Sequence, residues 1–216
     1  MRYRLCALLA LIAALWLLSA CAAPKAGQDP AKGNPAEGGA SSPEASQPAD
    51  MEQSLRAKAE EIAAMLRDRD LERLKTVIDP ETGLTFSPYA YIDTATAQRF
   101  RPQELPDFQD AEKRIWGAYD GTGEPIELTF REYYEKFVYD KDFAGAPEIS
   151  VNELKGTGNS PFNGTEVFPG ASCVEFHFPG FDPQHEGMDW ESLILVLMPR
   201  EQDWKLCAIV HASWTN

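Results

Sequence analysis

Hydrophobic and polar positions divide this chain into segments of different character, and the first is an unbroken apolar run. Residues 5–18 are all apolar, and Arg2 and Arg4 precede them. A transmembrane helix needs about 20 apolar residues, so this run is too short to span a bilayer. A basic start followed by a short apolar run is typical of a secretory signal.

Residues 22–50 show the opposite pattern, because they contain no Val, Ile, Leu, Met, Phe, Trp or Tyr. A segment with nothing to bury cannot offset the entropy that ordering would cost. We therefore expect a disordered, Pro-, Gly- and Ala-rich linker that ends where a helical pattern begins.

Helical periodicity starts after residue 50. Asp50 and Gln53 form a capping pair, and a helical apolar face follows them at Leu55, Ala59, Ile62 and Leu66. A second, short helix is predicted over residues 71–78. A third helix is predicted to start at the capping box of Thr129 and Glu132, with its apolar face formed by Phe130, Tyr133, Tyr134, Phe137 and Val138.

Strand-like patterns fill the rest. Residues 83–93 predict an edge strand or an irregular ribbon, broken by Pro88, and residues 114–130 predict a hairpin turning at Asp120-Gly121. Alternation predicts strands near residues 149–151, 173–178 and 204–214, and residues 193–198 predict a central strand covered on both faces. The closing strand should carry Trp204, Leu206, Ala208, Val210 and Ala212 on one face, and Cys207, Ile209, His211 and Ser213 on the other. The fold class is α+β: N-terminal helices packed on a curved antiparallel sheet in a single domain over residues 51–216.

The end of the apolar run adds a processing signal. Leu18-Ser19-Ala20-Cys21 resembles the bacterial lipobox, in which the cysteine thiol receives a diacylglycerol and the chain is cut before it. The resemblance implies a signal peptide over residues 1–20 and a lipidated Cys21 that begins a linker reaching residue 50. Acyl chains such as palmitate would then anchor the protein to the cell membrane, facing outside the cytoplasm. The alternative is an ordinary secretory signal with a chance cysteine.

Charge excludes one class of partner. The net charge is −14, and cleavage after residue 20 removes two of the 20 basic residues and none of the 34 acidic ones, which leaves −16. Such a chain carries no basic patch to bind nucleic acid, and anionic headgroups repel it, so the lipid tether would decide its location.

Two cysteines of the domain, Cys173 and Cys207, could form one disulfide in an oxidising compartment. Each lies in a strand-like segment, so each could instead be a small buried apolar residue. Sequence spacing does not decide between these alternatives.

Candidate chemistry is limited to a few polar residues in strands. The mixed strand faces carry Glu175, His177 and His211, which could form a His–carboxylate pair for proton transfer if the faces meet in a pocket. Polar residues of an alternating strand could equally face solvent. The segment Phe176 to Trp190 contains two histidines and three carboxylates, but its spacing fits no metal motif. We predict a solvated loop there, no metal and no cofactor.

Aromatic residues form a third candidate site. Tyr89, Tyr91, Tyr134 and Trp214 could line an apolar pocket for a small ligand. Aromatic residues at helical or strand spacing are also ordinary core residues.

The order of elements, and the segments "FSPYAYID", "EYYEKFVYDKDF" and "GMDWESLILVLMPREQDWKLCAIVHASW", are similar to those of bacterial lipoproteins with nuclear-transport-factor-2-like (cystatin-like, cone-shaped) domains. The resemblance implies a curved sheet that wraps helices around a conical pocket. It implies no activity, because that fold hosts isomerases, dehydratases and non-catalytic binding modules. The expected function is a binding or accessory module for a small ligand or an envelope partner; the alternatives are a small pocket enzyme and a passive envelope protein.

Overall fold

The computed structural model of the chain describes residues 48–201 and 203–214. The predicted signal peptide, Cys21 and nearly all of the predicted linker therefore lie outside the described residues. The helices are α1 (Pro48–Arg67), α2 (Leu71–Val77), α3 (Phe130–Phe137) and the short α4 (Gly164–Val167). None of the helices in these residues is both long enough and apolar enough to cross a membrane.

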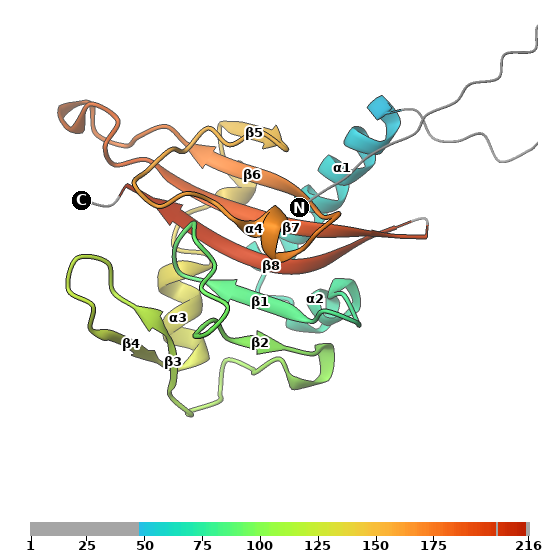
Figure 1. Cartoon of the computed structure of the whole chain (residues 1–216), viewed down its shortest axis with the longest axis horizontal. Coiled ribbons are helices and arrows are strands. Elements are labelled where there is room, and N and C mark those ends of the chain that lie inside the picture. Colours follow the sequence, from blue (N-terminus) through green and yellow to red (C-terminus); the bar gives the residue numbers. More distant parts are fainter. Residues whose placement is uncertain (1–47, 202, 215–216) are drawn as a thin grey trace, which may run out of the picture. The chain divides into compact units, whose positions relative to one another are not determined.

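Six strands form a mixed sheet in the order β2-β1-β8-β7-β6-β5. Their bounds are β1 Leu84–Ser87, β2 Arg99–Phe100, β5 Glu148–Val151, β6 Ser172–Phe178, β7 Glu191–Arg200 and β8 Asp203–Ser213. A separate two-stranded sheet is the predicted hairpin, β3 (Arg114–Ala118) with β4 (Pro125–Leu128). The α+β class is confirmed (Figure 1).

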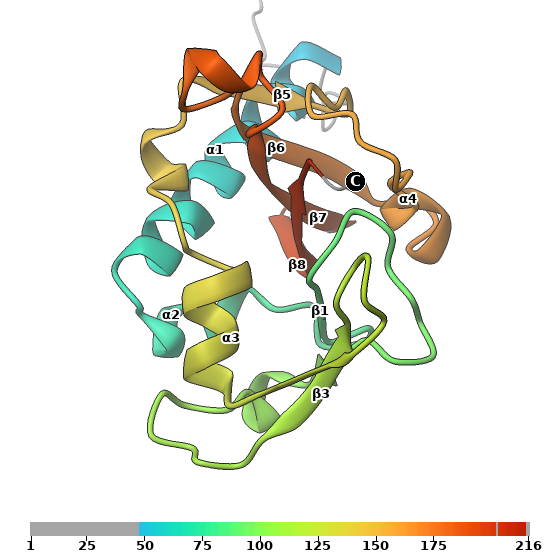
Figure 2. The ribbon, with the colours of Figure 1, turned by 90° about the vertical axis from the view of Figure 1, so that its left-hand side faces the viewer.

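The sheet is buried on both faces. Helices α1, α2 and α3 and the hairpin cover one face, which we call the helix face (Figure 2). Its core comprises, among others, Ile62, Phe86, Trp116, Phe130, Phe176, Leu193, Leu195 and Ile209. The opposite face, which we call the loop face, is covered by α4 and by the connections around residues 90–97 and 154–171, and its core comprises Ile92, Phe168, Trp190, Ile194, Val196, Ala208 and Val210. Strand β7 is therefore the predicted central strand, with alternate residues in each core.

Two strand predictions were wrong. Strand β1 is not an edge strand: it pairs in parallel with β8, and the two-residue β2 lies outside it, so the sheet is mixed rather than antiparallel. The predicted faces of β8 hold only beyond residue 207. A bulge sets Leu206 opposite Leu197 and Ala208 opposite Val196, so Leu206 lies on the helix face and Ala208 on the loop face.

The helical predictions were closer to the structure. Helix α1 begins at Pro48, so the last three residues of the predicted linker are helical. Helix α2 ends one residue earlier than predicted, at Val77. The capping box of α3 is present: the Thr129 side chain accepts from the Glu132 amide, and the Glu132 carboxylate accepts from the Thr129 amide at 2.8 Å. This box fixes the start of the helix that forms one wall of the site described next.

Candidate functional site

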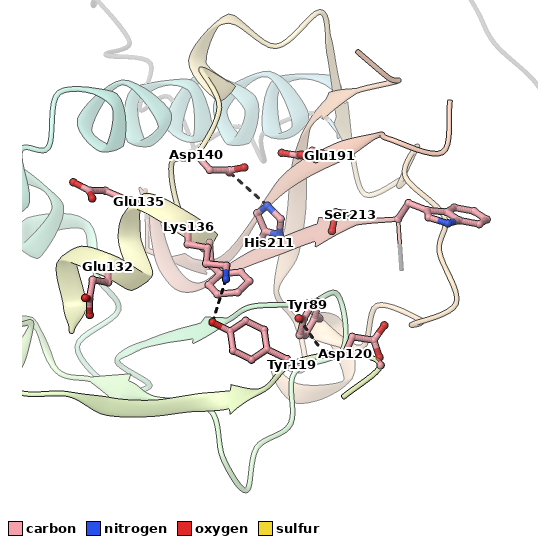
Figure 3. A pocket seen from close by; sticks show the side chains of 13 residues that line it. Tyr89, Tyr119, Asp120, Glu132, Glu135, Lys136, Asp140, Glu191, His211 and Ser213 are labelled. Carbon is pink, nitrogen blue, oxygen red and sulfur yellow. Dashed lines mark hydrogen bonds and ion pairs between the residues drawn. The ribbon is translucent and has the colours of Figure 1, made fainter. Parts of the chain in front are cut away.

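A polar cavity lies between α3, the β3–β4 turn and the adjoining ends of β7 and β8. Its volume is about 690 Å³, within the range of small-molecule sites. Figure 3 shows aromatic, acidic and histidine side chains from all four elements around it. The lining residues are Tyr89, Tyr119, Asp120, Gly121, Glu132, Glu135, Lys136, Phe137, Asp140, Glu191, His211, Ser213 and Trp214.

His211 forms the floor of this cavity. It pairs with Leu193 across the ladder, which directs its side chain to the helix face. The edge of its ring packs against Phe137 and Phe143, with ring centroids 5.9 Å and 6.5 Å apart. His211 is only 5% exposed, and neither ring nitrogen has a hydrogen-bond partner in the described part of the chain. An unpaired buried polar group costs roughly 1–3 kcal/mol, so this histidine lies where a ligand could satisfy it.

Two carboxylates lie beside His211. Asp140 follows the end of α3, and Glu191 is the first residue of β7, paired with Ser213 of β8. Asp140 Oδ1 lies 3.5 Å from His211 Nε2 (Figure 3). Lys141 Nζ bridges the two carboxylates, 3.0 Å from Asp140 Oδ2 and 2.9 Å from Glu191 Oε2.

These neighbours shift the two carboxyl pKa values in opposite directions. Burial raises the pKa of Asp140, but the nearby imidazole of His211, together with the ammonium of Lys141, outweighs burial and holds that pKa well below its usual range. Burial and the Asp140 carboxylate raise the pKa of Glu191, and Lys141 only partly opposes them. Asp140 is therefore the ionised member of the pair, and Glu191 is the more easily protonated member. Carboxyl groups with separated pKa values are a common arrangement at sites of proton transfer or cation binding.

Aromatic side chains form the mouth of the cavity. The Lys136 ammonium lies 4.5 Å from the centroid of the Tyr119 ring and 3.1 Å from its hydroxyl oxygen. The Tyr89 hydroxyl accepts from the amide of Asp120 at 3.1 Å, which ties the hairpin turn to the loop after β1. Trp214 is 40% exposed at the rim. Five lining residues are acidic and one is basic, so the field in the cavity opposes anions and favours neutral or cationic ligands.

The three predicted proton-transfer candidates are divided between the two faces of the sheet, and the His–carboxylate contact among them is that of His177 Nδ1 with Glu175 Oε1, 3.8 Å apart on the loop face. Glu175 and His177 lie on the loop face, whereas His211 lies on the helix face. None of these three side chains faces solvent, since Glu175 is fully buried and each histidine is 5% exposed. Of the two predicted histidines, only His211 lines the cavity, and the carboxylates beside it there are Asp140 and Glu191 rather than Glu175.

Glu175 has a structural explanation of its own. Its carboxylate accepts from Ser192 Oγ at 2.7 Å, from the Gly156 amide at 3.0 Å, and from Ser150 Oγ and the Lys155 amide. His177 Nδ1 lies 2.8 Å from Ser192 Oγ. Because the Ser192 hydroxyl donates to Glu175, it is not activated by His177 as a nucleophile would be. This network holds the residue 152–156 loop against the sheet.

The loop between β6 and β7 is held by hydrogen bonds among its own residues. Asp189 accepts from the amides of Phe181 and Asp182 at 3.0 Å and 2.7 Å, and His185 Nδ1 lies 3.3 Å from it. His185 is exposed, with 60% of its side chain accessible. The polar residues of this loop are therefore used to form its turns, as a solvated connection requires.

The candidate disulfide is not formed. Cys173 and Cys207 are buried free thiols. They lie on β6 and β8, which are separated by β7. Neighbouring strands are about 4.8 Å apart, so these Cα atoms are about 9–10 Å apart, beyond the roughly 7 Å limit for a disulfide.

The four aromatic candidates for the ligand pocket lie in different parts of the structure. Tyr89 and Trp214 line the cavity. Tyr91 does not line it and is 52% exposed. Tyr134 is buried in the core, where its hydroxyl donates to the carbonyl of Leu66.

Sequence reasoning missed Asp140, Glu191 and Lys136. Neither Asp140 nor Glu191 carries a motif. The β7–β8 register brings Glu191 to His211, and the packing of α3 on the sheet brings Asp140 there. One general signal existed: charged residues directly at the ends of strands and helices often face a cavity rim.

Comparison with protein-family models, with curated proteins and with solved structures gives no match to this chain.

Proposed function

We propose that this chain is a membrane-anchored extracytoplasmic lipoprotein whose domain binds a small ligand in the cavity above His211. The observation that carries the proposal is a cavity of about 690 Å³ with aromatic walls and a buried histidine that lacks a hydrogen-bond partner in the described residues. Helices on one face of a curved sheet, with the cavity at one end of that face, support the resemblance to cone-shaped nuclear-transport-factor-2-like domains.

The ligand class follows from the lining. Tyr89, Tyr119 and Trp214 offer flat apolar surface to the body of a ligand. His211 and the two carboxylates offer acceptors for a donor group. A neutral or positively charged molecule with an aromatic or aliphatic body fits this lining, and an anion does not. An open cavity of this kind favours a small ligand over an envelope protein partner, and over a passive envelope protein.

The test compares two exposed or half-exposed tyrosines. Ligands found by screening small amines and neutral aromatic compounds should bind at least about tenfold more weakly to Tyr119→Ala, because an aromatic wall is lost. Tyr91→Ala is the matched control, since Tyr91 lies outside the cavity. Equal loss in both variants, or loss in Tyr91→Ala alone, would show that the ligand binds elsewhere.

A pocket enzyme is the second candidate, and one observation favours it. His211 lies 3.5 Å from an ionised Asp140 and beside Glu191, whose pKa is raised. A His–carboxylate pair of this kind can move a proton to or from a bound substrate. If the protein is an enzyme, His211→Gln should lower its reaction rate by several orders of magnitude. His177→Gln, on the other face of the sheet, should leave the rate unchanged.

A further inference from the structure

We propose that Asp140, Glu191 and His211 bind one divalent transition-metal ion, with zinc as the best-fitting member of the class. The proposal goes beyond ligand binding, because the site needs no organic ligand to be occupied. It rests on the donor set, on the lack of hydrogen bonds to the donors and on their spacing.

The donors lack hydrogen bonds, although Asp140 Oδ1 lies 3.5 Å from His211 Nε2 in an ion pair. Asp140 Oδ1, Glu191 Oε2 and both ring nitrogens of His211 are buried, and none makes a hydrogen bond to any other described residue. Lys141 Nζ lies 2.9 Å from Glu191 Oε2 in an ion pair whose angle does not suit a hydrogen bond. Buried polar atoms are nearly always satisfied, so a cluster of unsatisfied ones indicates a missing partner. An imidazole nitrogen and two carboxylates together form a common ligand set for a divalent transition metal.

The spacing suits one ion. The donor atoms of the three residues all lie within 4.8 Å of one another. Zinc bonds of about 2.1 Å in a tetrahedron place ligand atoms about 3.4 Å apart. His211 Nε2 and Asp140 Oδ1 are 3.5 Å apart, so these two donors already have that separation, and the Glu191 donor, within 4.8 Å of both, would have to move closer to them.

Charge also favours a cation at this point. The two carboxylates are buried beside each other, and the only ammonium that contacts both of them in the described residues is that of Lys141. The Lys141 side chain is 34% exposed, and its ammonium lies 5.4 Å from the centroid of the Phe181 ring. It can therefore swing out to solvent when a metal ion takes its place between the carboxylates.

Three protein ligands leave the metal coordination incomplete. His211, Asp140 and Glu191 all line the cavity, so the remaining position opens into it. A zinc ion held by three side chains with one open position is the arrangement of catalytic rather than structural zinc sites. Water or a donor atom of a ligand would complete it.

The experiment is calorimetric titration of zinc into the full mature chain, purified in detergent and freed of metal with a chelator. We expect one site per chain. His211→Gln and Asp140→Asn should each weaken binding at least tenfold, because each removes one of three ligands. His185→Gln is the matched control: this exposed histidine also lies beside a carboxylate, Asp189, and its loss should change nothing.

A second variant should strengthen zinc binding instead of weakening it, which misfolding cannot do. Lys141→Met removes the competing ammonium and keeps the apolar stem, so it should tighten zinc binding about tenfold. Lys155→Met, whose ammonium pairs with Glu153, is its control and should have no effect. Cobalt substitution should give visible d–d absorption that is lost in His211→Gln.

Three results would overturn the proposal. One is the absence of zinc binding to the wild-type chain. Another is binding that is lost in His185→Gln but kept in His211→Gln. The third is unchanged or weaker binding in Lys141→Met. Because no organic ligand enters this titration, a negative result would leave the small-ligand proposal standing.

Discussion

At the scale of single residues, the buried Asp79 shows how a charge can be kept in the core. The carboxylate accepts from Arg200 Nε at 2.7 Å and Nη2 at 3.2 Å, and from the Thr82 amide at 2.8 Å. Burial raises the pKa of Asp79, but Arg200 and Thr82 outweigh burial and hold it below its usual value. Asp79 thereby joins the loop after α2 to the end of β7.

The lowered pKa of Asp79 makes the free energy of unfolding depend on pH. The folded state holds the ionised form of Asp79 more strongly than the unfolded state does, so its stabilisation is present above about pH 4. That stabilisation is lost as the pH falls through the folded-state pKa. Asp79→Asn should therefore lower the free energy of unfolding by about 2–3 kcal/mol at pH 7 and by much less near pH 2.

Urea unfolding at several pH values measures this difference. Asp68→Asn is the control, because Asp68 forms an exposed pair with Arg67 and should leave the unfolding midpoint unchanged at every pH. A difference between wild type and Asp79→Asn that stays constant from pH 7 to pH 2 would contradict this account.

At the scale of elements, the order of strands decides which side chains can react. Cys173 and Cys207 are kept apart by β7, and burial raises the pKa of both thiols. Both groups should therefore stay reduced and react slowly, because the thiolate is the reactive form.

Alkylation followed by intact-mass measurement tests this prediction. Without reductant, the native mature chain should take up almost no iodoacetamide, and the chain unfolded in guanidinium should take up two equivalents. A native mass two protons below that of the reduced chain, with no labelling after unfolding, would show that the two thiols are bridged.

The elements that sequence could predict are those fixed by local chemistry. The capping box of α3 and the Asp120-Gly121 hairpin depend on neighbouring residues, and both are present. The position of β1 between β2 and β8, and the bulge that reverses the faces of β8 at Cys207, depend on partners distant in the chain. The same limit explains the site: His211 was a candidate, but its actual neighbours are set by distant contacts, Asp140 by the packing of α3 on the sheet and Glu191 by the β7–β8 register.

At the scale of the whole molecule, the proposed anchor and the cavity act together. A lipid on Cys21 would hold the domain at the membrane by its acyl chains, because the cleaved chain, with a net charge of −16 (18 basic and 34 acidic residues), gains nothing from anionic headgroups. The domain itself would be free to sample small molecules outside the cytoplasm.

Replacement of Cys21 tests the anchor. Cys21→Ala should accumulate as an unprocessed precursor that takes up no radiolabelled palmitate, because the acceptor thiol is absent. Cys6→Ala, within the apolar run of the signal, is the control and should be processed normally. Normal cleavage and lipid labelling of Cys21→Ala would contradict the lipoprotein proposal.

The central claim is that the cavity above His211 is the binding site. The chain contains three histidines, so its imidazole NMR spectrum reports on three separate places: the cavity at His211, the loop face at His177 and the exposed loop at His185. A screen of small amines and neutral aromatic compounds should yield ligands that shift the His211 signals and leave those of His177 and His185 unchanged. A screen in which no compound shifts His211, or in which the binding compounds shift His177 or His185 instead, would contradict the account.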